Sequence, residues 1–350
     1  MMRQRDSLAE KIKTVDELEF EQLALDVFNY QARYNPIYAE FLQLLRVGPE
    51  SVSQIADIPA LPIACFKQHI LRTGSWPSVQ VFTSSGTSQT QTSQHWLRSD
   101  PWYKHHARRA FEQQYGPLES FVVLALLPAY LERQGSSLVF MVNDFIQVSG
   151  RAESGFYLYD QEELIKKLQL LEAQNQKFLL LGVSFALLDL AEALASDTIR
   201  IPEGSIIMET GGMKGRRREL TRAELHRQIS QGFKLEGSDT DQPGAGEKPI
   251  DIHSEYGMTE LLSQAYAPKA GRFSCAPSLR VMCRDLTDPF CIRTDGKTGA
   301  INCIDLANLD TISFIATDDL GKVYPDGSFE VLGRMDYSDT RGCNLLYAQA

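Results

Sequence analysis

The sequence predicts an α/β protein with parallel or mixed sheets flanked by helices, followed by a smaller β-rich part. Between residues 121 and 254, short apolar runs typical of buried strands alternate with segments of helical periodicity. This alternation is the pattern of βαβ units. From about residue 279, short β-rich segments are separated by turns such as Gly296-Lys-Thr-Gly299 and Pro325-Asp-Gly327, which indicates a small β subdomain.

The amino-terminal part is expected to be helical. Ser7-Leu-Ala-Glu10 has the spacing of a capping box and predicts the start of a short helix there. Residues 16–34 carry apolar side chains at helical spacing, and Asn35-Pro36 should end that helix before residues 38–45 continue it. Residues 58–71 contain two prolines and should begin extended before turning helical.

The central elements follow from the same two signals. We expect strands at residues 121–127, 138–142, 178–182, 205–209 and 250–254. We expect helices at residues 102–115, 161–175 and 185–194, and a last one that starts at the capping box Thr221-Arg-Ala-Glu224.

Composition narrows the class of protein. The 350 residues contain 43% hydrophobic and 23% charged side chains, as in ordinary globular proteins. A net charge of −10 argues against nucleic acid as the partner. The six cysteines contain no C-x-x-C pair, so a zinc cluster is not expected. With no signal-peptide pattern and no apolar run long enough to span a bilayer, we expect a cytoplasmic protein with reduced thiols.

The stretch from Val81 to His95 is the first candidate site, because nearly every residue from Thr83 to Ser93 carries a hydroxyl or an amide. Such a loop offers many donors to a phosphate. The same composition is also typical of a solvated linker, and the loop alone does not separate the two interpretations. The sequence has neither a G-x-x-x-x-G-K-[ST] phosphate loop nor a G-x-G-x-x-G dinucleotide motif.

Four further segments follow in order: Glu209-Thr-Gly-Gly-Met-Lys-Gly215, Tyr256-Gly-Met-Thr-Glu260, Thr317-Asp-Asp-Leu-Gly321 and Gly333-Arg-Met-Asp336. Paired glycines let a flat ring approach the backbone, and the second segment combines an aromatic ring, a hydroxyl and a carboxylate. Each segment alone also fits an ordinary turn, the second one a strand-to-helix turn.

In this order the motifs resemble the adenylate-forming enzymes, which include the acyl-CoA synthetases. Leu61-Pro-Ile63, Phe66-Lys67, Ser84-Ser-Gly-Thr-Ser88 and Arg341-Gly-Cys343 look like the acyl-protein synthetase branch of bacterial fatty-acid reductase systems. That branch is related to the phenylacetate–CoA ligases. The resemblance implies the large domain of that fold, with residues 1–75 as its helical part, 76–272 as the nucleotide- and acyl-binding core, 273–332 as a β-rich subdomain and 333–350 as a hinge-like tail.

The resemblance also implies an AMP-forming acid–thiol ligase that uses ATP and Mg²⁺. Its phosphate contacts would come from Ser84, Ser85, Gly86, Thr87 and Ser88. Its adenine contacts would come from Gly211, Gly212, Met213, Tyr256, Gly257 and Met258. Thr259 would bind the α-phosphate, Glu260 the Mg²⁺, and Asp319 (less favoured, Asp318) the ribose, with Arg334 nearby.

Cys343 would accept the acyl group as a thioester, with coenzyme A and a carrier protein as the other acceptors. Arg341 could lower the pKa of this thiol, whereas a buried terminal cysteine is the alternative. Fatty acids are the first expected substrates and aryl acids the second. A reductase or acyltransferase would be the protein partner.

Two departures from the family pattern stand out. The phosphate loop ends Gln89-Thr-Gln-Thr-Ser93 and lacks the lysine of the usual Gly-x-Pro-Lys-Gly ending. The mobile carboxyl-terminal domain, with its catalytic lysine, is expected to be missing. We expect Lys214 to supply the cation, with Arg216–Arg218 or a partner as alternatives.

Two other functions remain open from the sequence. Gly182-Val-Ser-Phe-Ala186 is close to a nucleophile elbow, and with His253 as base Ser184 could serve an α/β hydrolase or acyltransferase. However, Ala186 replaces the second glycine. A catalytically weak nucleotide- or acyl-binding protein is the other alternative.

Overall fold

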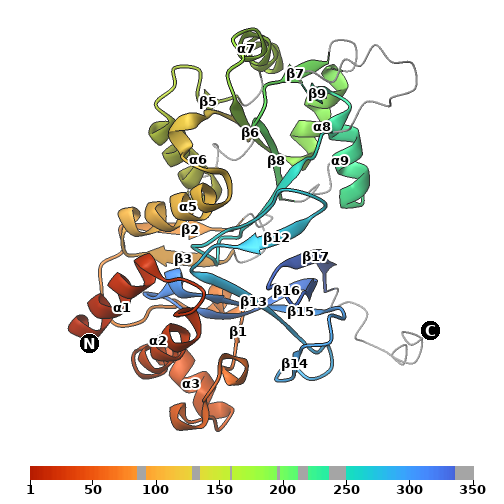
Figure 1. Cartoon of the computed structure of the whole chain (residues 1–350). Helices are drawn as coiled ribbons and strands as arrows, with labels where there is room; N and C mark the ends of the chain where they lie inside the picture. Colours follow the sequence, from red (N-terminus) through yellow and green to blue (C-terminus); the bar gives the residue numbers. More distant parts are fainter. Residues whose placement is uncertain are drawn as a thin grey trace.

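The computed structural model describes residues 1–84, 92–127, 135–157, 160–194, 198–211, 220–235 and 250–335. The α/β architecture is confirmed: thirteen strands of these ranges form one mixed sheet with helices on both sides (Figure 1). Its path runs β14-β13-β15-β16-β17-β12-β11-β10-β8-β6-β4-β5, and β1 pairs with β16 off this path.

The parallel part of the sheet forms the upper half of the molecule in Figure 1. Its strands are β4 (Val122–Leu126), β5 (Gly155–Phe156), β6 (Phe178–Val183), β8 (Ile206–Thr210) and β10 (His253–Tyr256). Neighbouring strands in the row β4-β6-β8-β10 pair in parallel, and every residue of β4, β6 and β8 is buried. Continuous apolar runs are expected for strands covered on both faces.

The helices of this half lie on the two faces of the sheet. They are α5 (Asp100–Tyr115), α6 (Ser137–Ser149), α7 (Gln161–Ala173), α8 (Ser184–Ala193) and α9 (Arg222–Ser230). Successive side chains of β10 point to opposite faces of the sheet: His253 contacts Tyr115 of α5, while Ser254 contacts His226 of α9. A small parallel pair, β7 (Ile199–Ile201) and β9 (Phe233–Leu235), lies beside them.

The antiparallel part continues the same sheet through the lower half, with the amino-terminal helices packed beside it. Its strands are β11 (Ala265–Ala267), β12 (Arg272–Cys275), β13 (Leu279–Arg284), β14 (Ile292–Arg293), β15 (Gly299–Asp305), β16 (Phe314–Val323) and β17 (Phe329–Arg334). The helices are α1 (Met2–Thr14), α2 (Phe20–Tyr34) and α3 (Pro36–Leu44). The predicted domain boundaries within this continuous sheet stay predictions.

Short elements join the two halves. β1 (Leu61–Pro62) leads into α4 (Cys65–Gln68), and β2 (Gln80–Thr83) pairs with β3 (Gln94–Leu97) as a separate hairpin. Single 3-10 turns lie at Pro49–Ser51, Ile55–Asp57, Leu118–Ser120 and Leu306–Asn308. None of the helices within the described ranges is long and apolar enough to cross a membrane.

Two predicted elements were wrong. Residues 138–142, expected as a strand, lie in helix α6, whose first turn is capped by the Ser136 hydroxyl accepting from the Val139 amide. Gly150 ends that helix at φ 61°, so the capping residues outweigh the β-favouring run between them. Ser7 does not open a helix either: α1 already begins at Met2, because its buried face of Leu8, Ala9 and Ile12 extends the helix across that position.

Two boundaries shifted at the candidate site. The strand predicted at residues 250–254 is β10, which starts at His253 and includes Tyr256. The turn after it does not start a helix, since the chain continues into strand β11. By contrast, the capping box at Thr221 and Glu224 is confirmed at the start of α9.

Candidate active site

The carboxyl ends of three parallel strands bring the candidate residues to one edge of the sheet. Ser184 follows β6, Gly211 follows β8 and Gly257 follows β10. The sheet changes from parallel to antiparallel pairing between β10 and β11. Ligands of open α/β sheets bind outside the carboxyl ends of the parallel strands.

The hydroxyl-rich loop lies between the two strands of a hairpin. Its ends are held together because the Ser84 amide donates to the Ser93 carbonyl at 3.1 Å and the Ser93 amide donates to the Ser84 Oγ at 2.9 Å. Ser84 therefore sits at the base of the loop. Ser85, Gly86, Thr87 and Ser88 lie outside the described residues.

The segment Thr259–Glu260 is fixed by polar groups from three other parts of the chain. His95 Nδ1 lies 2.9 Å from the Thr259 carbonyl oxygen, and Asn308 Nδ2 donates to the Glu260 carbonyl at 2.8 Å. The Asp305 carboxyl accepts from the amides of Leu262 and Ser263 at 2.8 and 2.9 Å. The backbone around Glu260 is therefore held on both sides.

These anchoring groups are themselves buried. A carbonyl can only accept, so His95 carries its proton on Nδ1, and burial lowers the pKa of His95 to about 4 and keeps the ring neutral. Its Nε2 faces the Thr311 hydroxyl at 3.0 Å. Burial likewise raises the pKa of Asp305 to about 6, against the hydrogen bonds that favour its ionised form.

Glu260 is only 7% exposed. Burial raises its pKa, while the adjacent Ser93 hydroxyl and the positive charges of Arg334 and Lys67 lower it. One buried carboxylate and a hydroxyl are hard oxygen ligands that suit Mg²⁺. In the described part of the chain there is no group of three metal-ligating side chains, so phosphates and water would complete such a coordination sphere.

A second cluster joins β10 to the antiparallel strands. The Tyr256 hydroxyl donates to Asp319 Oδ2 at 2.8 Å, and Arg334 Nε donates to Asp319 Oδ1 at 3.2 Å. Asp319 and Arg334 are cross-strand partners of β16 and β17. The Tyr256 ring lies edge-on to Phe273 and Phe329. This cluster places three sequence-predicted residues side by side.

Gly257 and Met258 connect the two clusters. A Cβ at position 257 would lie 2.2 Å from Glu255 Oε1, so the absence of a side chain lets this carboxyl fold back along its own strand end. Met258 is partly buried against the core. Gly212, Met213, Lys214 and Cys343 lie outside the described residues.

The geometry around Ser184 disfavours the hydrolase alternative. Ser184 is buried, and its hydroxyl lies 2.6 Å from the Gly211 carbonyl and 3.3 Å from Glu209 Oε2, which can share its proton. The proposed base, His253, contacts the Tyr115 hydroxyl through Nδ1 at 3.2 Å. A nucleophile would need its proton accepted by the base; here Ser184 instead holds Gly211 at the end of β8.

The sequence interpretation missed a buried pair at the same edge. The Thr210 hydroxyl donates to the Glu255 carboxyl across β8 and β10. Burial raises the pKa of Glu255 to about 7, and the nearby negative charge of Glu209 adds to the increase. A carboxylate next to Tyr256 was visible in the sequence, but its partner depends on strand register.

The described residues have the fold of the N-terminal domain of adenylate-forming enzymes. The long-chain-fatty-acid–CoA ligase FadD1 of Archaeoglobus fulgidus matches with a TM-score of 0.52 and 12% identity, over 75% of this chain and 52% of that chain. ATP-bound MatB from Rhodopseudomonas palustris matches with a TM-score of 0.50 and 17% identity, over 75% and 49%.

The O-succinylbenzoate coenzyme A synthetase MenE of Bacillus subtilis, solved with AMP, matches with a TM-score of 0.50 and 16% identity over 74% of this chain and 50% of that chain. This chain thus spans about half the length of these solved ligases. No protein-family model and no curated protein sequence matches it.

Proposed function

We propose that the chain activates a carboxylic acid with ATP and transfers the acyl group to a thiol. A carboxylate is a poor electrophile because its leaving group would be oxide or hydroxide. Attack of a carboxylate oxygen on the α-phosphorus of ATP forms an acyl-adenylate and releases pyrophosphate. A thiolate then attacks the acyl carbon, a thioester forms, and AMP leaves.

One observation carries this proposal. Tyr256, Asp319 and Arg334 form one hydrogen-bonded cluster, while Thr259 and Glu260 lie beside the base of the hydroxyl-rich loop. Segments far apart in the sequence thus meet at one end of the parallel strands, and they include the residues to which the resemblance assigns ribose, adenine, α-phosphate and metal contacts. The neighbouring solved ligases with bound ATP or AMP have the same fold.

In this proposal each residue has a defined task. Asp319 accepts from the ribose hydroxyls, Tyr256 and the Gly211–Met213 segment border the adenine, and Thr259 donates to the α-phosphate. The loop from Ser84 to Ser88 donates to the departing phosphates, and Lys214 adds positive charge. Glu260 and the Ser93 hydroxyl would hold Mg²⁺, which supplies charge neutralisation during phosphoryl transfer.

Fatty acids are the first proposed substrates and aryl acids the second. Cys343 is the first proposed acceptor, ahead of coenzyme A or a carrier protein, and a reductase or acyltransferase would receive the acyl group. The α/β-hydrolase alternative is not proposed, because the Ser184 hydroxyl donates its hydrogen bond to the Gly211 carbonyl.

The test is a screen for acid-dependent exchange of pyrophosphate into ATP over fatty and aryl acids. We expect exchange with at least one acid, and intact-protein mass spectrometry should show an acyl adduct that hydroxylamine removes and that Cys343→Ala lacks. ATP binding without exchange for any acid would favour a nucleotide-binding protein instead. Exchange without an adduct in the wild type would move the acceptor from Cys343 to a soluble thiol.

A further inference from the structure

The short helix α4 is held directly against the candidate active site. The strand before it, β1, pairs in parallel with β16 at Ile315 and Ala316. Ala316 lies three residues before Asp319 on that strand. The Ile63 amide continues this pairing by donating to the Ala316 carbonyl at 2.9 Å. The start of α4 is thus fixed relative to the strand that carries Asp319.

The same helix is fixed on its other side by Phe66. This side chain is fully buried, and its ring centroid lies 5.5 Å from that of His95. His95 in turn hydrogen-bonds the Thr259 carbonyl. Lys67 is the next residue along α4 and is exposed, so this buried anchor holds an exposed lysine on the helix that packs against His95.

The charges around Glu260 agree with this placement. Among described residues, Arg334 and Lys67 are two cations whose charge acts on its carboxyl. Arg334 is already bonded to Asp319. Lys67 forms no salt bridge within 4 Å to any residue in the described ranges. Its ammonium group can therefore reach an anion at this edge without breaking an ion pair of that set.

We infer that Lys67 supplies the cation that faces the pyrophosphate portion of ATP at this site. The inference rests on the proposed function and addresses the hydroxyl-rich loop, which contains no lysine between Thr83 and Ser93. Pyrophosphate carries its negative charge away from the α-phosphorus as the P–O bond breaks. A compact ammonium on a flexible stem suits such a group, whose position changes as it leaves.

The experiment compares Lys67→Ala, Lys67→Arg and the control Lys166→Ala, which removes an exposed lysine from α7 at the opposite end of the molecule from β1. Acid-dependent ATP–pyrophosphate exchange and the affinities for ATP and AMP are measured on each full-length protein. For Lys67→Ala we expect kcat/KM for exchange to fall about 10- to 100-fold. ATP affinity should fall with it, while AMP affinity stays within about twofold, since AMP lacks the two outer phosphates.

Lys67→Arg should recover much of the activity because it keeps the charge, and Lys166→Ala should behave as wild type. Equal exchange rates in Lys67→Ala and wild type would overturn the inference and leave the proposed function intact. Equal losses of ATP and AMP affinity would also overturn it, because they would indicate a structural role. Loss confined to Lys214→Ala would assign the cation to that residue instead. Wild-type protein without exchange or ATP binding would overturn both the proposed function and this inference.

Discussion

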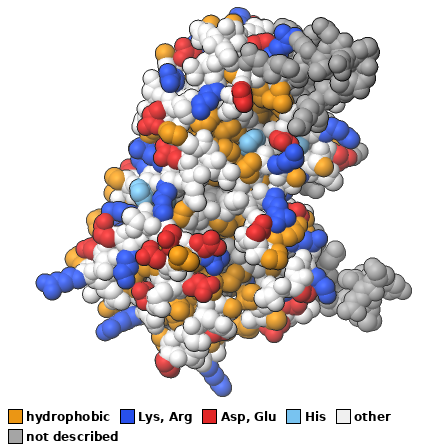
Figure 2. All heavy atoms as spheres, viewed as in Figure 1, with side chains coloured by type: hydrophobic (Ala, Val, Ile, Leu, Met, Phe, Trp, Pro, Cys, Tyr) orange, Lys and Arg blue, Asp and Glu red, His pale blue; other side chains and the backbone are white. Residues whose placement is uncertain are grey.

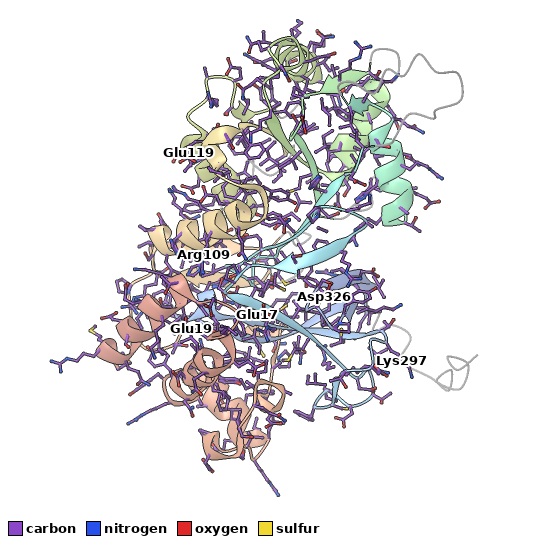
Figure 3. All side chains as sticks on the ribbon, in the orientation of Figure 1. Glu17, Glu19, Arg109, Glu119, Lys297 and Asp326 are labelled. Atoms are coloured by element: carbon purple, nitrogen blue, oxygen red, sulfur yellow. The ribbon has the colours of Figure 1, made fainter. Side chains whose placement is uncertain are left out.

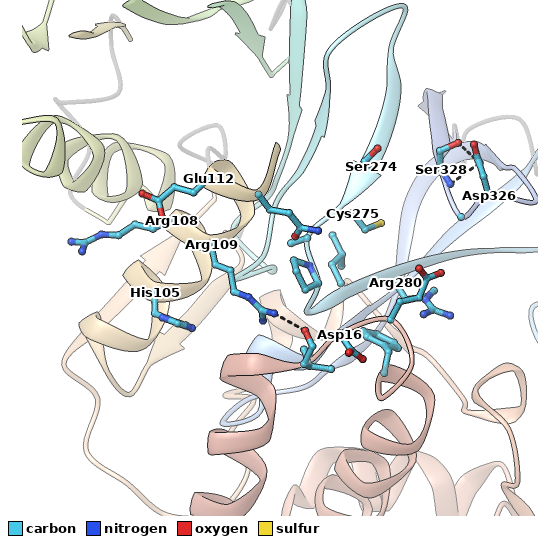
Figure 4. A pocket seen from close by; sticks show the side chains of 18 of the residues that line it. Asp16, His105, Arg108, Arg109, Glu112, Ser274, Cys275, Arg280, Asp326 and Ser328 are labelled. Atoms are coloured by element: carbon cyan, nitrogen blue, oxygen red, sulfur yellow. Dashed lines mark hydrogen bonds between the residues drawn. The ribbon is translucent and has the colours of Figure 1, made fainter. Parts of the chain in front are cut away.

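A surface groove and the candidate active site differ in how their charged side chains are placed. The groove, of about 1320 Å³, lies between the start of α2, helix α5, strands β12 and β13 and the turn at residues 325–328 (Figure 4). Two of its charged side chains form ion pairs at the surface, Arg280 with Glu21 and Asp326 with Arg272. At the candidate active site, by contrast, the residues Glu255, Glu260 and Asp319 are only 7–8% exposed.

The groove has the appearance of an ordinary polar surface. Acidic side chains gather across the middle of the face in Figure 2, near Glu17 and Glu19, which Figure 3 labels. Arg109 points from α5 to the carboxyl end of α1 and donates to the Val15 carbonyl at 2.6 Å (Figure 4). Basic side chains that bind the last carbonyls of a helix stabilise it, so this arginine has a structural role.

The comparison predicts that the cluster of buried carboxyls, and not the groove of large volume, is the active site. An ionised carboxyl without compensating contacts costs several kcal/mol to bury. Buried carboxyls gathered at the ends of neighbouring strands are a common feature of functional sites. The predictions below test this distinction, beginning with the residue for which we expect the largest effect.

Replacing Glu260 with glutamine should abolish most of the activity. The amide has the same shape but no charge, so it would lose its affinity for Mg²⁺ while keeping the packing. We expect ATP–pyrophosphate exchange to fall at least about 100-fold, as for other groups that stabilise transition-state charge. The matched control is Glu17→Gln in the groove, which should change the exchange rate less than about twofold.

The two variants also separate function from folding. Removing the buried charge of Glu260 should leave the thermal midpoint unchanged or slightly higher. A large fall in exchange for both variants, or for neither, would contradict the distinction between the groove and the candidate active site.

Glu255→Gln should change how stability depends on pH. The folded pKa of Glu255 is raised to about 7 from 4.5, chiefly by burial. Its stabilising contribution is therefore complete below about pH 4.5 and is lost as pH rises through about 7. At about 1.4 kcal/mol per pKa unit, the loss is on the order of 3 kcal/mol. The variant lacks this group, so its free energy of unfolding should fall less over that window.

Urea unfolding of both proteins at pH 5, 6, 7 and 8 measures this difference. Thr210→Val is the companion variant, since it removes the hydroxyl that lowers the pKa of Glu255. It should move the transition to higher pH. Parallel stability curves for wild type and Glu255→Gln would show that the carboxyl is not buried in solution as described.

Much of the fold could be predicted from the sequence because the parallel strands are continuous apolar runs. Strands β4, β6 and β8 lie within two residues of their predicted ends. The prediction of a strand at residues 138–142 was wrong because these residues form an apolar run like that of a buried strand. In the structure they belong to helix α6, whose buried face includes Met141, Val142 and Phe145. The capping residues Ser136 and Gly150 carried the information that would have corrected the prediction.

The candidate site was predictable only in part. Motif order brought Tyr256, Glu260 and Asp319 together as candidates, and the structure places them at one sheet edge. His95 and Asp305 could not be predicted, and Lys67 was visible only as part of the Phe66-Lys67 motif, since the relation of all three to Glu260 depends on tertiary pairing of distant segments. A buried histidine or aspartate carries no local pattern that distinguishes an anchor for an active-site loop from an ordinary core residue.

The smallest effect is expected in the groove, from Arg280→Ala. Arg280 lies over the Phe20 ring at 4.6 Å and bridges to the exposed Glu21 at 3.6 Å. Both contacts are weak at a surface, so we expect a loss of about 0.5–1 kcal/mol in unfolding free energy. Exchange activity should stay within about twofold of wild type, because this side chain contacts neither the Tyr256 nor the Glu260 cluster. A tenfold fall in exchange without unfolding would place the groove in the reaction, and buried charge would then be an incomplete guide to the active site.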